Sequence, residues 1–277
     1  MSMGYHRILT IQDISCVGQC SMTVALPVLS ACGHETCVLP TALLSTHTGG
    51  FGTPRIVHFS DALGEIAAHW QKNGITFDAI LTGYLGSVPA VRTAGQIMDT
   101  LLAPGGKRIV DPAMADHGKL YSGFDDAYVQ AMSALCEKAD VILPNLTEAA
   151  ILSGKPFEER TDETYACQLL EGISVPNVIL TGVGETGCGF LLRENGTCRT
   201  YSHPRIPGSF SGTGDLFAAV FTGAWTAGRE LYNSAVIAAD FTRKCIERTA
   251  AAPAHWYGIQ FEPFLPELAA LVGENHG

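Results

Sequence analysis

Short apolar stretches alternate with longer amphipathic stretches along most of this sequence, and this alternation narrows the possible folds more than any other feature. Strands are predicted at residues 6–12, 36–39, 78–82, 108–110, 141–143 and 177–181. Helices are predicted between them at residues 21–31, 61–73, 88–102, 124–138, 146–153 and 161–171, the last with Thr161 as its N-cap. Strand–helix–strand units of this kind place their strands parallel in one sheet. We therefore expect an α/β fold with a mostly parallel central sheet.

The final third of the chain departs from this alternation. Two strand-like stretches, residues 188–192 and 197–202, flank Asn195-Gly196, a dipeptide typical of a β-hairpin turn. Long helices are predicted at residues 214–227 and 230–249, and a last helix near residues 263–271. Neither an internal repeat nor a low-complexity linker interrupts the sequence, so residues 1–277 are interpreted as one domain.

One loop is long enough to be functional. Residues 40–56 are rich in Gly, Thr and Pro and contain no clear strand or helix pattern. Loops of this length in compact domains often cover a binding site. We therefore interpret this stretch as a flap that closes over the site.

Composition and charge exclude several classes of protein. Hydrophobic residues make up 47% and charged residues 16%, which is typical of a compact globular chain. The net charge of −10 disfavours nucleic acid as a partner but allows a small anion held by backbone amides. No apolar run reaches the roughly 18 residues that a membrane span requires, and no signal peptide precedes the first strand. Nine cysteines without a CxxC pair suggest reduced thiols, so we expect a cytoplasmic protein with no membrane partner.

The stretch at residues 207–225 carries the strongest chemical signal. A Pro/Gly/Ser loop leads through Gly212-Thr213-Gly214 to Asp215 and then into an apolar helix. Glycines allow a close approach to a ligand, and the first helical amides are unpaired at the positive end of the helix dipole. A phosphate suits that position. Asp215 has two open interpretations: it caps the helix, or it accepts the proton of a hydroxyl that attacks phosphorus.

Polar residues stand at or just after the ends of several predicted strands. The set comprises Asp13, Tyr84, Asp111, Asn145, Glu148 and Thr181. Ligands of parallel sheets bind at the carboxyl ends of the strands, so we expect these side chains to line one site. Asp111 and Glu148, with Asp116 nearby, supply hard oxygen ligands that suit Mg²⁺. Each of these residues alone has a plainer explanation, since Asp111 can cap a turn and Glu148 can lie in a helix's first turn.

Two nucleotide-binding motifs can be set aside. Residues 182–187 match the glycine pattern of dinucleotide-binding folds, but the match lies late in the chain and precedes a predicted strand, not a helix. A tight connection between two strands is the preferred interpretation. The sequence contains no GxxxxGK[ST] loop, which excludes a Walker-type NTPase.

Taken together, these motifs resemble those of the ribokinase-like kinases and, among them, the pyridoxal kinases. The GTGD sequence before a small-residue helix is similar to the anion hole and base of the whole superfamily. Further segments resemble the pyridoxal kinases in particular: Ile11-Gln12 with Gly18, STHTG at 45–49, TGYLGS at 82–87, DPAM at 111–114 and PNLTE at 144–148. They occur in the family's order, so the resemblance covers most of the chain.

The resemblance implies a three-layer αβα ribokinase-like fold and ATP-dependent phosphorylation of the 5′-hydroxymethyl group of pyridoxal, pyridoxine or pyridoxamine. It implies Asp215 as the base and the amides of Gly212, Thr213 and Gly214 as the anion hole. The remaining expected site residues are Asp13, Ser15, His47, Thr48 and Tyr84 around the pyridine ring, Asp111, Asn145, Thr181 and Ser211 around ATP, and Asp116 and Glu148 around Mg²⁺. The resemblance also implies a homodimer and leaves a requirement for a monovalent cation open.

One position departs from the family's pattern. Many pyridoxal kinases have Ser after Ile-Gln, where this chain has Asp13, with Ser15 two residues on. A carboxylate there can pair with a charged amine or a protonated pyridine nitrogen, so pyridoxamine is our hypothesis for the preferred vitamer. Two alternatives stay open: a hydroxymethylpyrimidine kinase of thiamine synthesis, and a non-catalytic vitamer-binding protein on the same fold. The intact Asp215 argues against the second.

Overall fold

The computed structural model describes residues 5–273, and within them one sheet of nine strands forms the centre of the molecule. The strand order is β11-β10-β9-β8-β5-β4-β1-β2-β3. The strands are β1 (Arg7–Ser15), β2 (Glu35–Leu44), β3 (Ile56–His58), β4 (Phe77–Thr82), β5 (Leu102–Val110), β8 (Val141–Ile142), β9 (Asn177–Val183), β10 (Gly187–Glu194) and β11 (Thr197–Pro204). The central strands pair in parallel, whereas β3, β10 and β11 add antiparallel edges. The expected mostly parallel sheet is confirmed.

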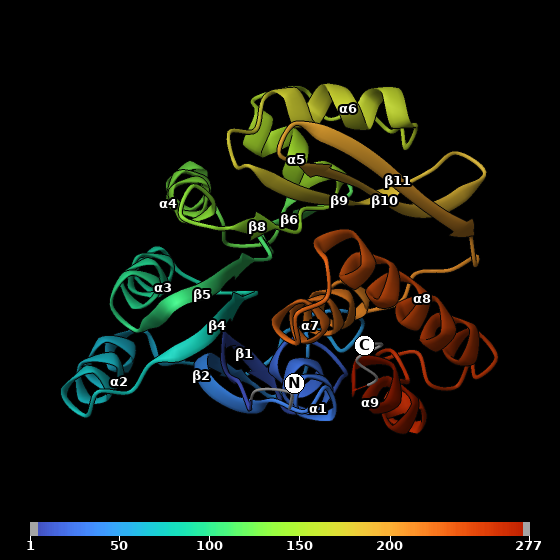
Figure 1. Ribbon diagram of the computed structural model, residues 1–277. Helices are drawn as coiled ribbons and strands as arrows, with labels where there is room; N and C mark the ends of the chain where they lie inside the picture. The colour runs from blue at the N-terminus through green and yellow to red at the C-terminus, as the bar shows by residue number, and fades with distance from the viewer. Residues whose placement is uncertain (1–4, 274–277) are drawn as a thin grey trace.

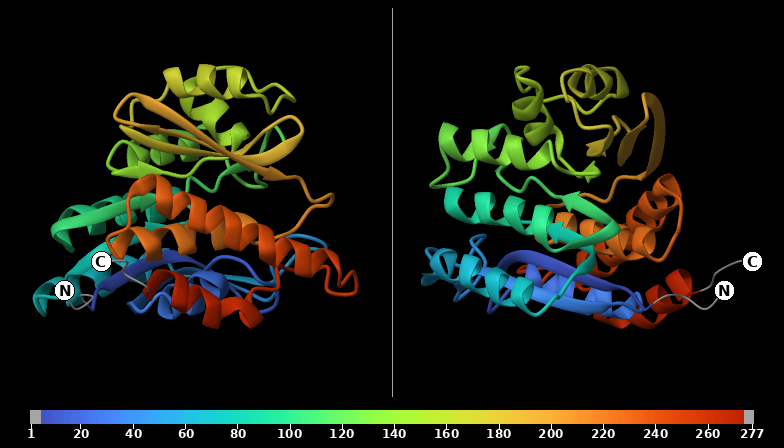
Figure 2. Two further views of the ribbon diagram at one scale, coloured as in Figure 1. Left: turned by 45° about the vertical axis from the view of Figure 1, so that its right-hand side comes forward. Right: turned by 60° about the vertical axis from the view of Figure 1, so that its left-hand side comes forward.

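Helices cover both faces of this sheet (Figures 1 and 2). One layer holds α2 (Ser60–Lys72), α3 (Val88–Thr100), α4 (Asp126–Cys136), α5 (Leu146–Ser153) and α6 (Glu163–Glu171); the other holds α1 (Met22–Ala31), α7 (Thr213–Thr226), α8 (Leu231–Ala250) and α9 (Leu265–Gly273) with the 3₁₀ turn η1 (Glu262–Phe264). Each layer buries its own apolar cluster against the sheet. The structure thus confirms the three-layer αβα arrangement.

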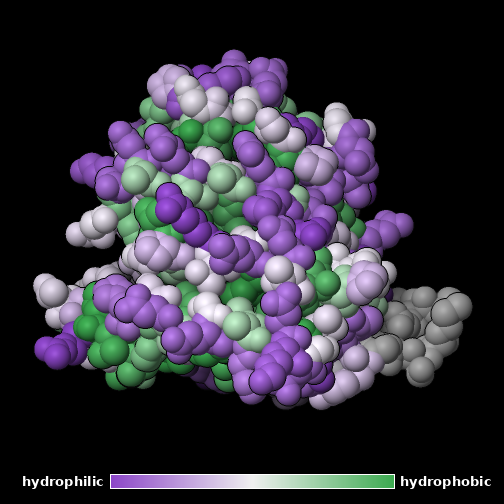
Figure 3. All heavy atoms as spheres, turned by 90° about the vertical axis from the view of Figure 1, so that its left-hand side faces the viewer, coloured by the Kyte–Doolittle hydropathy of each residue, from purple (hydrophilic) through white to green (hydrophobic). Residues whose placement is uncertain are grey.

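The outer surface over α2–α4 is mostly hydrophilic, with hydrophobic residues interspersed (Figure 3). This is the pattern of amphipathic helices, which turn one apolar stripe toward the sheet. No helix within residues 5–273 is long and apolar enough to cross a membrane.

Several element boundaries differ from those expected. Strand β2 continues through Pro40 to Leu44 and pairs with β3, so the loop between them shrinks to residues 45–55, which we call the flap loop. A small hairpin, β6 (Ala115–Asp116) and β7 (Lys119–Leu120), was not expected. The N-cap of α6 is Asp162, whose carboxylate accepts a bond from the Tyr165 amide, and Thr161 instead donates to the Gly184 carbonyl.

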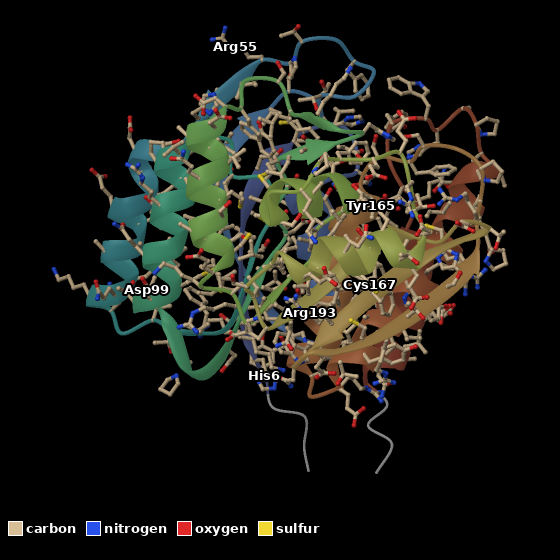
Figure 4. All side chains as sticks on the ribbon, turned by 90° about the horizontal axis from the view of Figure 1, so that it is seen from above. His6, Arg55, Asp99, Tyr165, Cys167 and Arg193 are labelled. Atoms are coloured by element: carbon tan, nitrogen blue, oxygen red, sulfur yellow. The ribbon has the colours of Figure 1, made fainter. Side chains whose placement is uncertain are left out.

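The parallel strands bring their carboxyl ends to one edge of the sheet. In Figure 4 the strands run across the picture, from the side of His6, which precedes β1, to the side of Arg55, the last residue of the flap loop. Because β1, β4, β5, β8 and β9 run in the same direction, the polar residues at or near their ends meet at that edge. Residues 182–187 form the tight β9–β10 connection that the sequence indicated.

Candidate active site

The glycine turn, residues 212–214, joins a loop to the start of α7. Gly212 is the N-cap residue and has a φ of 83°, a left-handed conformation that favours glycine. Thr213 is the first helical residue, and its hydroxyl donates to the Phe210 carbonyl at 3.2 Å. Asp215 is therefore the third residue of the helix, and its interpretation as the N-cap is wrong. The amides of the turn are left at the positive end of α7.

The Asp215 carboxylate lies in an environment that suits a base. Burial raises its pKa to about 6, and the nearby charge of Asp13 adds to that shift. A hydrogen bond from the Ser21 backbone amide opposes the shift. A carboxyl group of this kind is ionised at neutral pH and still basic enough to accept a proton from an alcohol.

Asp13 lies at an irregularity of β1, where the ladder to β2 shifts register between Gln12 and Ile14. Bulges of this kind redirect a side chain out of the regular alternation. Asp13 is only 3% exposed, and its Oδ2 accepts a bond from the Ser15 hydroxyl at 3.2 Å. Burial raises the pKa of Asp13, whereas hydrogen bonds from the Ser21 and Ser15 hydroxyls lower it.

Ser21 connects the two carboxylates, and the sequence did not single it out as a site residue. Its backbone has φ 48° and ψ −126°, a strained conformation for a residue with a side chain. Its amide bonds to Asp215 while its hydroxyl bonds to Asp13. Strain of this kind persists only where the surroundings impose it, and it is common at functional sites.

Stacked aromatic side chains, beginning with Tyr84, lie near Asp13. The ring of Tyr84 stacks on Phe124 with centroids 5.4 Å apart, and Phe124 stacks on Tyr128 at 3.7 Å. Burial and the charge of Asp13 both raise the pKa of Tyr84, so its hydroxyl is protonated. Asp13, Ser15 and Tyr84, all expected at the pyridine ring, thus lie near one another and near Asp215.

Two more carboxylates, those of Asp111 and Glu148, lie near Asp215. Burial raises the pKa of Asp111, and the charges of Glu148 and then Asp215 raise it further. Glu148 forms a capping box with Asn145 at the start of α5. Its Oε1 accepts from the Met114 amide at 3.0 Å and its Oε2 accepts from the Asn145 amide at 3.0 Å.

The β6–β7 hairpin adds two side chains at the rim. Asp116 is exposed, and its Oδ1 accepts from the His117 amide at 2.8 Å. Tyr121 lies within electrostatic range of Glu148, Asp111, Asp116 and Asp215, which together with burial raise its pKa. Sequence reasoning missed Tyr121, because no motif marks it and the hairpin was not expected. Within residues 5–273 no three His, Cys, Asp or Glu side chains form a ready metal cage.

The other residues expected at ATP are tied to the backbone of neighbouring elements. The Asn145 amide nitrogen donates to the Ala115 carbonyl at 2.8 Å, and the Thr181 hydroxyl donates to the Pro144 carbonyl at 3.3 Å. Ser211, just before the glycine turn, accepts a bond at its carbonyl from the Ile259 amide at 3.1 Å. These ties hold the strand ends of β8 and β9 and the glycine turn at the same edge.

The flap loop contains the last two expected site residues. Thr48 is exposed, whereas His47 is 6% exposed and has both ring nitrogens engaged. The Gly49 amide donates to His47 Nδ1 at 2.9 Å, so Nε2 carries the proton and donates to the Tyr257 carbonyl at 3.1 Å. His47 is therefore neutral, and burial lowers its pKa. Because both ring nitrogens are hydrogen-bonded within the protein, His47 can offer a ligand only the carbon atoms of its ring.

Comparison with known proteins places this arrangement among kinases. A sequence profile of the phosphomethylpyrimidine kinase family matches residues 26–259. The chain is similar to a pyridoxal kinase structure from Lactobacillus plantarum, at 35% identity and a TM-score of 0.89, over 99% of this chain and 100% of that one. A Bacteroides thetaiotaomicron protein assigned to the phosphomethylpyrimidine kinases, in a crystal form with pyridoxal, is 32% identical with a TM-score of 0.87 and 96% of both chains covered. A pyridoxal kinase from Arabidopsis thaliana is 28% identical over 78% of this chain and 73% of its own.

Proposed function

The chain belongs to the phosphomethylpyrimidine kinase family and, within it, to the pyridoxal kinases of the ribokinase-like superfamily; we propose that it transfers the γ-phosphoryl group of ATP to the 5′-hydroxyl of a B6 vitamer. The observation that carries the proposal is the position of Asp215. It stands in the first turn of α7, directly after the amides of Gly212 to Gly214 and beside the buried Asp13. A base next to an anion cradle is what phosphoryl transfer to an alcohol requires.

In this mechanism the protein mainly positions groups and stabilises charge. The amides of the glycine turn and the dipole of α7 hold the transferring phosphoryl group. Asp215 accepts the proton of the attacking 5′-hydroxyl. Its raised pKa makes it a stronger base than an exposed aspartate would be.

The carboxylates around the site support a divalent cation. The charges that act on Asp111 are those of Glu148 and Asp215, so these groups repel one another unless a cation lies among them. Asp111, Asp116 and Glu148 would hold Mg²⁺, largely through water, because the backbone amides already occupy the Glu148 oxygens. When bound, Mg²⁺ neutralises charge on the ATP phosphates. Asn145, Thr181 and Ser211 complete the ATP side.

The vitamer ring is proposed to lie against Tyr84, with Asp13 and Ser15 beneath it and the flap loop with His47 and Thr48 above. Asp13 is buried beside the hydroxyl groups of Ser15 and Ser21 and near the Asp215 carboxylate, so a cationic group of the ligand would offset the cost of its desolvation. The pyridinium N–H, which all three vitamers share, and the amine, which only pyridoxamine carries, are such groups. This supports the hypothesis that pyridoxamine is the preferred vitamer.

The test is ADP formation with Mg²⁺-ATP and pyridoxal, pyridoxine, pyridoxamine or hydroxymethylpyrimidine, with Asp215→Ala measured alongside. We expect turnover of the B6 vitamers and its loss by about 10²- to 10⁴-fold in the variant. Turnover of hydroxymethylpyrimidine alone would instead assign the chain to thiamine synthesis with the same mechanism. Vitamer binding without any turnover would support the non-catalytic alternative and contradict the proposal.

Several expectations from the sequence stay predictions. They are the homodimer, a monovalent cation, the cytoplasmic location and the single domain spanning residues 1–277. Nucleic acid and membrane partners are not part of the proposal.

A further inference from the structure

A short segment near the C-terminus, residues 255–259, contacts three loops near the glycine turn. The carbonyl of Tyr257 accepts two bonds, from the Gln19 amide at 3.3 Å and from His47 Nε2 at 3.1 Å. Gly258 pairs with Gln19 as a parallel β-bridge. The next residue, Ile259, donates its backbone amide to the Ser211 carbonyl at 3.1 Å. The 255–259 segment therefore links the loop after β1, the flap loop and the loop that enters α7.

The flap loop is held to this segment by more than one hydrogen bond. The Phe51 ring lies 4.7 Å from that of Trp256 and 5.2 Å from that of His47. A Cβ built on Gly50 would come within 2.5 Å of the Trp256 ring, so the flap backbone lies directly against the indole. Trp256 is nevertheless 54% exposed. Its packing thus serves the flap loop rather than the apolar core of the molecule.

Contacts within the flap loop centre on His47. Its amide donates to the Val17 carbonyl at 3.0 Å, and its Nδ1 accepts from the Gly49 amide. A Cβ on Gly18 would overlap the imidazole, so the glycine at position 18 is what lets His47 pack there. A Cβ on Gly49 would lie 3.7 Å from the Ser211 hydroxyl. The flap loop therefore lies close to Ser211, the residue that precedes the glycine turn.

We propose that the 255–259 segment fixes the flap loop in its closed position against the glycine turn, and that His47 is a positioning residue whose bond to the Tyr257 carbonyl makes this connection. Trp256 acts with it by covering Gly50 and Phe51. The consequence for catalysis rests on the proposed kinase function: a flap that is not held closed admits water, and ATP is then hydrolysed without transfer to the vitamer.

Two substitutions of His47 separate its bonds. In His47→Asn the side-chain oxygen can still accept from the Gly49 amide, but the side chain is too short to reach the Tyr257 carbonyl. In His47→Gln the longer amide can reach the Tyr257 carbonyl and keep the connection between the two segments. Trp256→Ala removes the indole, and Leu26→Ala, which removes an exposed apolar side chain from α1, is the matched control.

The first readout is hydrogen exchange of residues 45–55 in the full chain without substrates, which does not depend on kinase activity. We expect exchange to accelerate about two- to tenfold in His47→Asn, as for the loss of one hydrogen bond, and to accelerate in Trp256→Ala. His47→Gln should stay closer to the wild type, and Leu26→Ala should not differ from it. Wild-type exchange rates in both His47→Asn and Trp256→Ala would overturn the proposal.

The second readout is the ratio of ADP formed to vitamer phosphorylated. We expect this ratio to rise above that of the wild type in His47→Asn and Trp256→Ala, and His47→Gln to restore it. A vitamer KM that rises equally in His47→Asn and His47→Gln, with exchange and coupling unchanged, would mean that His47 binds the ring directly and would overturn its positioning role. A wild type that phosphorylates no vitamer refutes the proposed function, whereas the exchange result still decides the role of the segment.

Discussion

Gly212→Ala tests whether the backbone position of the glycine turn, and not only Asp215, is required for phosphoryl transfer. Gly212 has a φ of 83°, and a Cβ there would overlap the Gln19 carbonyl oxygen and lie 3.0 Å from its carbonyl carbon. Gly228, at the other end of α7, has a φ of 95°, and a Cβ there would meet nothing within 4 Å. Alanine at either position would therefore have to adopt a positive φ, but only alanine at position 212 would also clash with a neighbouring residue.

The shared cost is conformational. A residue with a side chain pays about 1–2 kcal/mol to adopt the left-handed region, so both variants should lose a similar part of their stability for this reason. The second cost belongs to Gly212 alone. Non-bonded heavy atoms pack best about 3.5–4.0 Å apart, so relief of the overlap with the Gln19 carbonyl oxygen moves the turn or Gln19 by roughly 1 Å or more. A displacement of about 1 Å at the reacting groups costs on the order of 10²-fold in rate.

The assay is steady-state ADP formation with Mg²⁺-ATP and pyridoxal, with the melting temperature of each variant measured by circular dichroism. We expect kcat to fall about 10²-fold in Gly212→Ala and to stay at the wild-type value in Gly228→Ala, although both variants melt at a lower temperature. A folded Gly212→Ala variant with wild-type kcat would refute the argument. Equal losses of kcat in the two variants would also refute it, because they would show that the rate responds to any disturbance of α7 and not to the position of the glycine turn.

Three further predictions concern the carboxylates. Because burial raises the pKa of Asp215 to about 6, kcat/KM of the wild type should fall as pH drops below that value. The same raised pKa affects the free energy of unfolding. The protonated Asp215 stabilises the folded state at low pH, and this contribution is lost as pH rises through 6. Asp215→Asn should therefore remove activity without lowering the melting temperature at pH 8, and a pH-independent rate or a marked loss of stability would contradict this. Asp13→Ser should reduce kcat/KM for pyridoxamine more than for pyridoxine, and an unchanged order of the three vitamers would exclude Asp13 as the selecting group. Chelation with EDTA should abolish ADP formation, and Asp111→Asn should raise the Mg²⁺ concentration needed for half-maximal rate; full activity in excess EDTA would contradict the metal assignment.

Much of the fold followed from local patterns, because amphipathic periodicity reports which face of each element is buried. The elements missed are those in which this signal is weak. Strand β3 is short and exposed on every residue, and β6 and β7 have two residues each. The strand was predicted to end at residue 39, with Pro40 opening the loop, yet β2 continues through Pro40, which pairs with Gln12 of β1. A proline lacks the N–H of a ladder bond, and the neighbouring pairs of the ladder outweigh that loss.

The site was predictable where it depends on topology and not where it depends on long-range packing. The rule that ligands bind at the carboxyl ends of parallel strands grouped Asp13, Tyr84 and Asp111, and the structure brings Tyr84 near Asp13 and both Asp13 and Asp111 near Asp215. Ser21 could not be found in this way, because its φ of 48° is imposed by the surrounding structure and no residue type encodes it. The 255–259 segment lies more than 200 residues from the flap loop in sequence, with 210 residues separating His47 from Tyr257.

The electrostatics of the site explain why an acidic chain can hold a polyanionic substrate. Asp13 raises the pKa of Asp215, and Glu148 and Asp215 raise that of Asp111, so each carboxylate destabilises the ionised form of the next. The ATP phosphates would add to this repulsion. In the proposed mechanism, the amides at the start of α7 and a divalent cation would relieve it, and neither changes the net charge of −10 carried by the chain itself. Under the proposed function, this repulsion would make ATP binding depend on the cation, whereas burial and then the charge of Asp13 raise the pKa of Asp215 and make it basic enough to accept the proton.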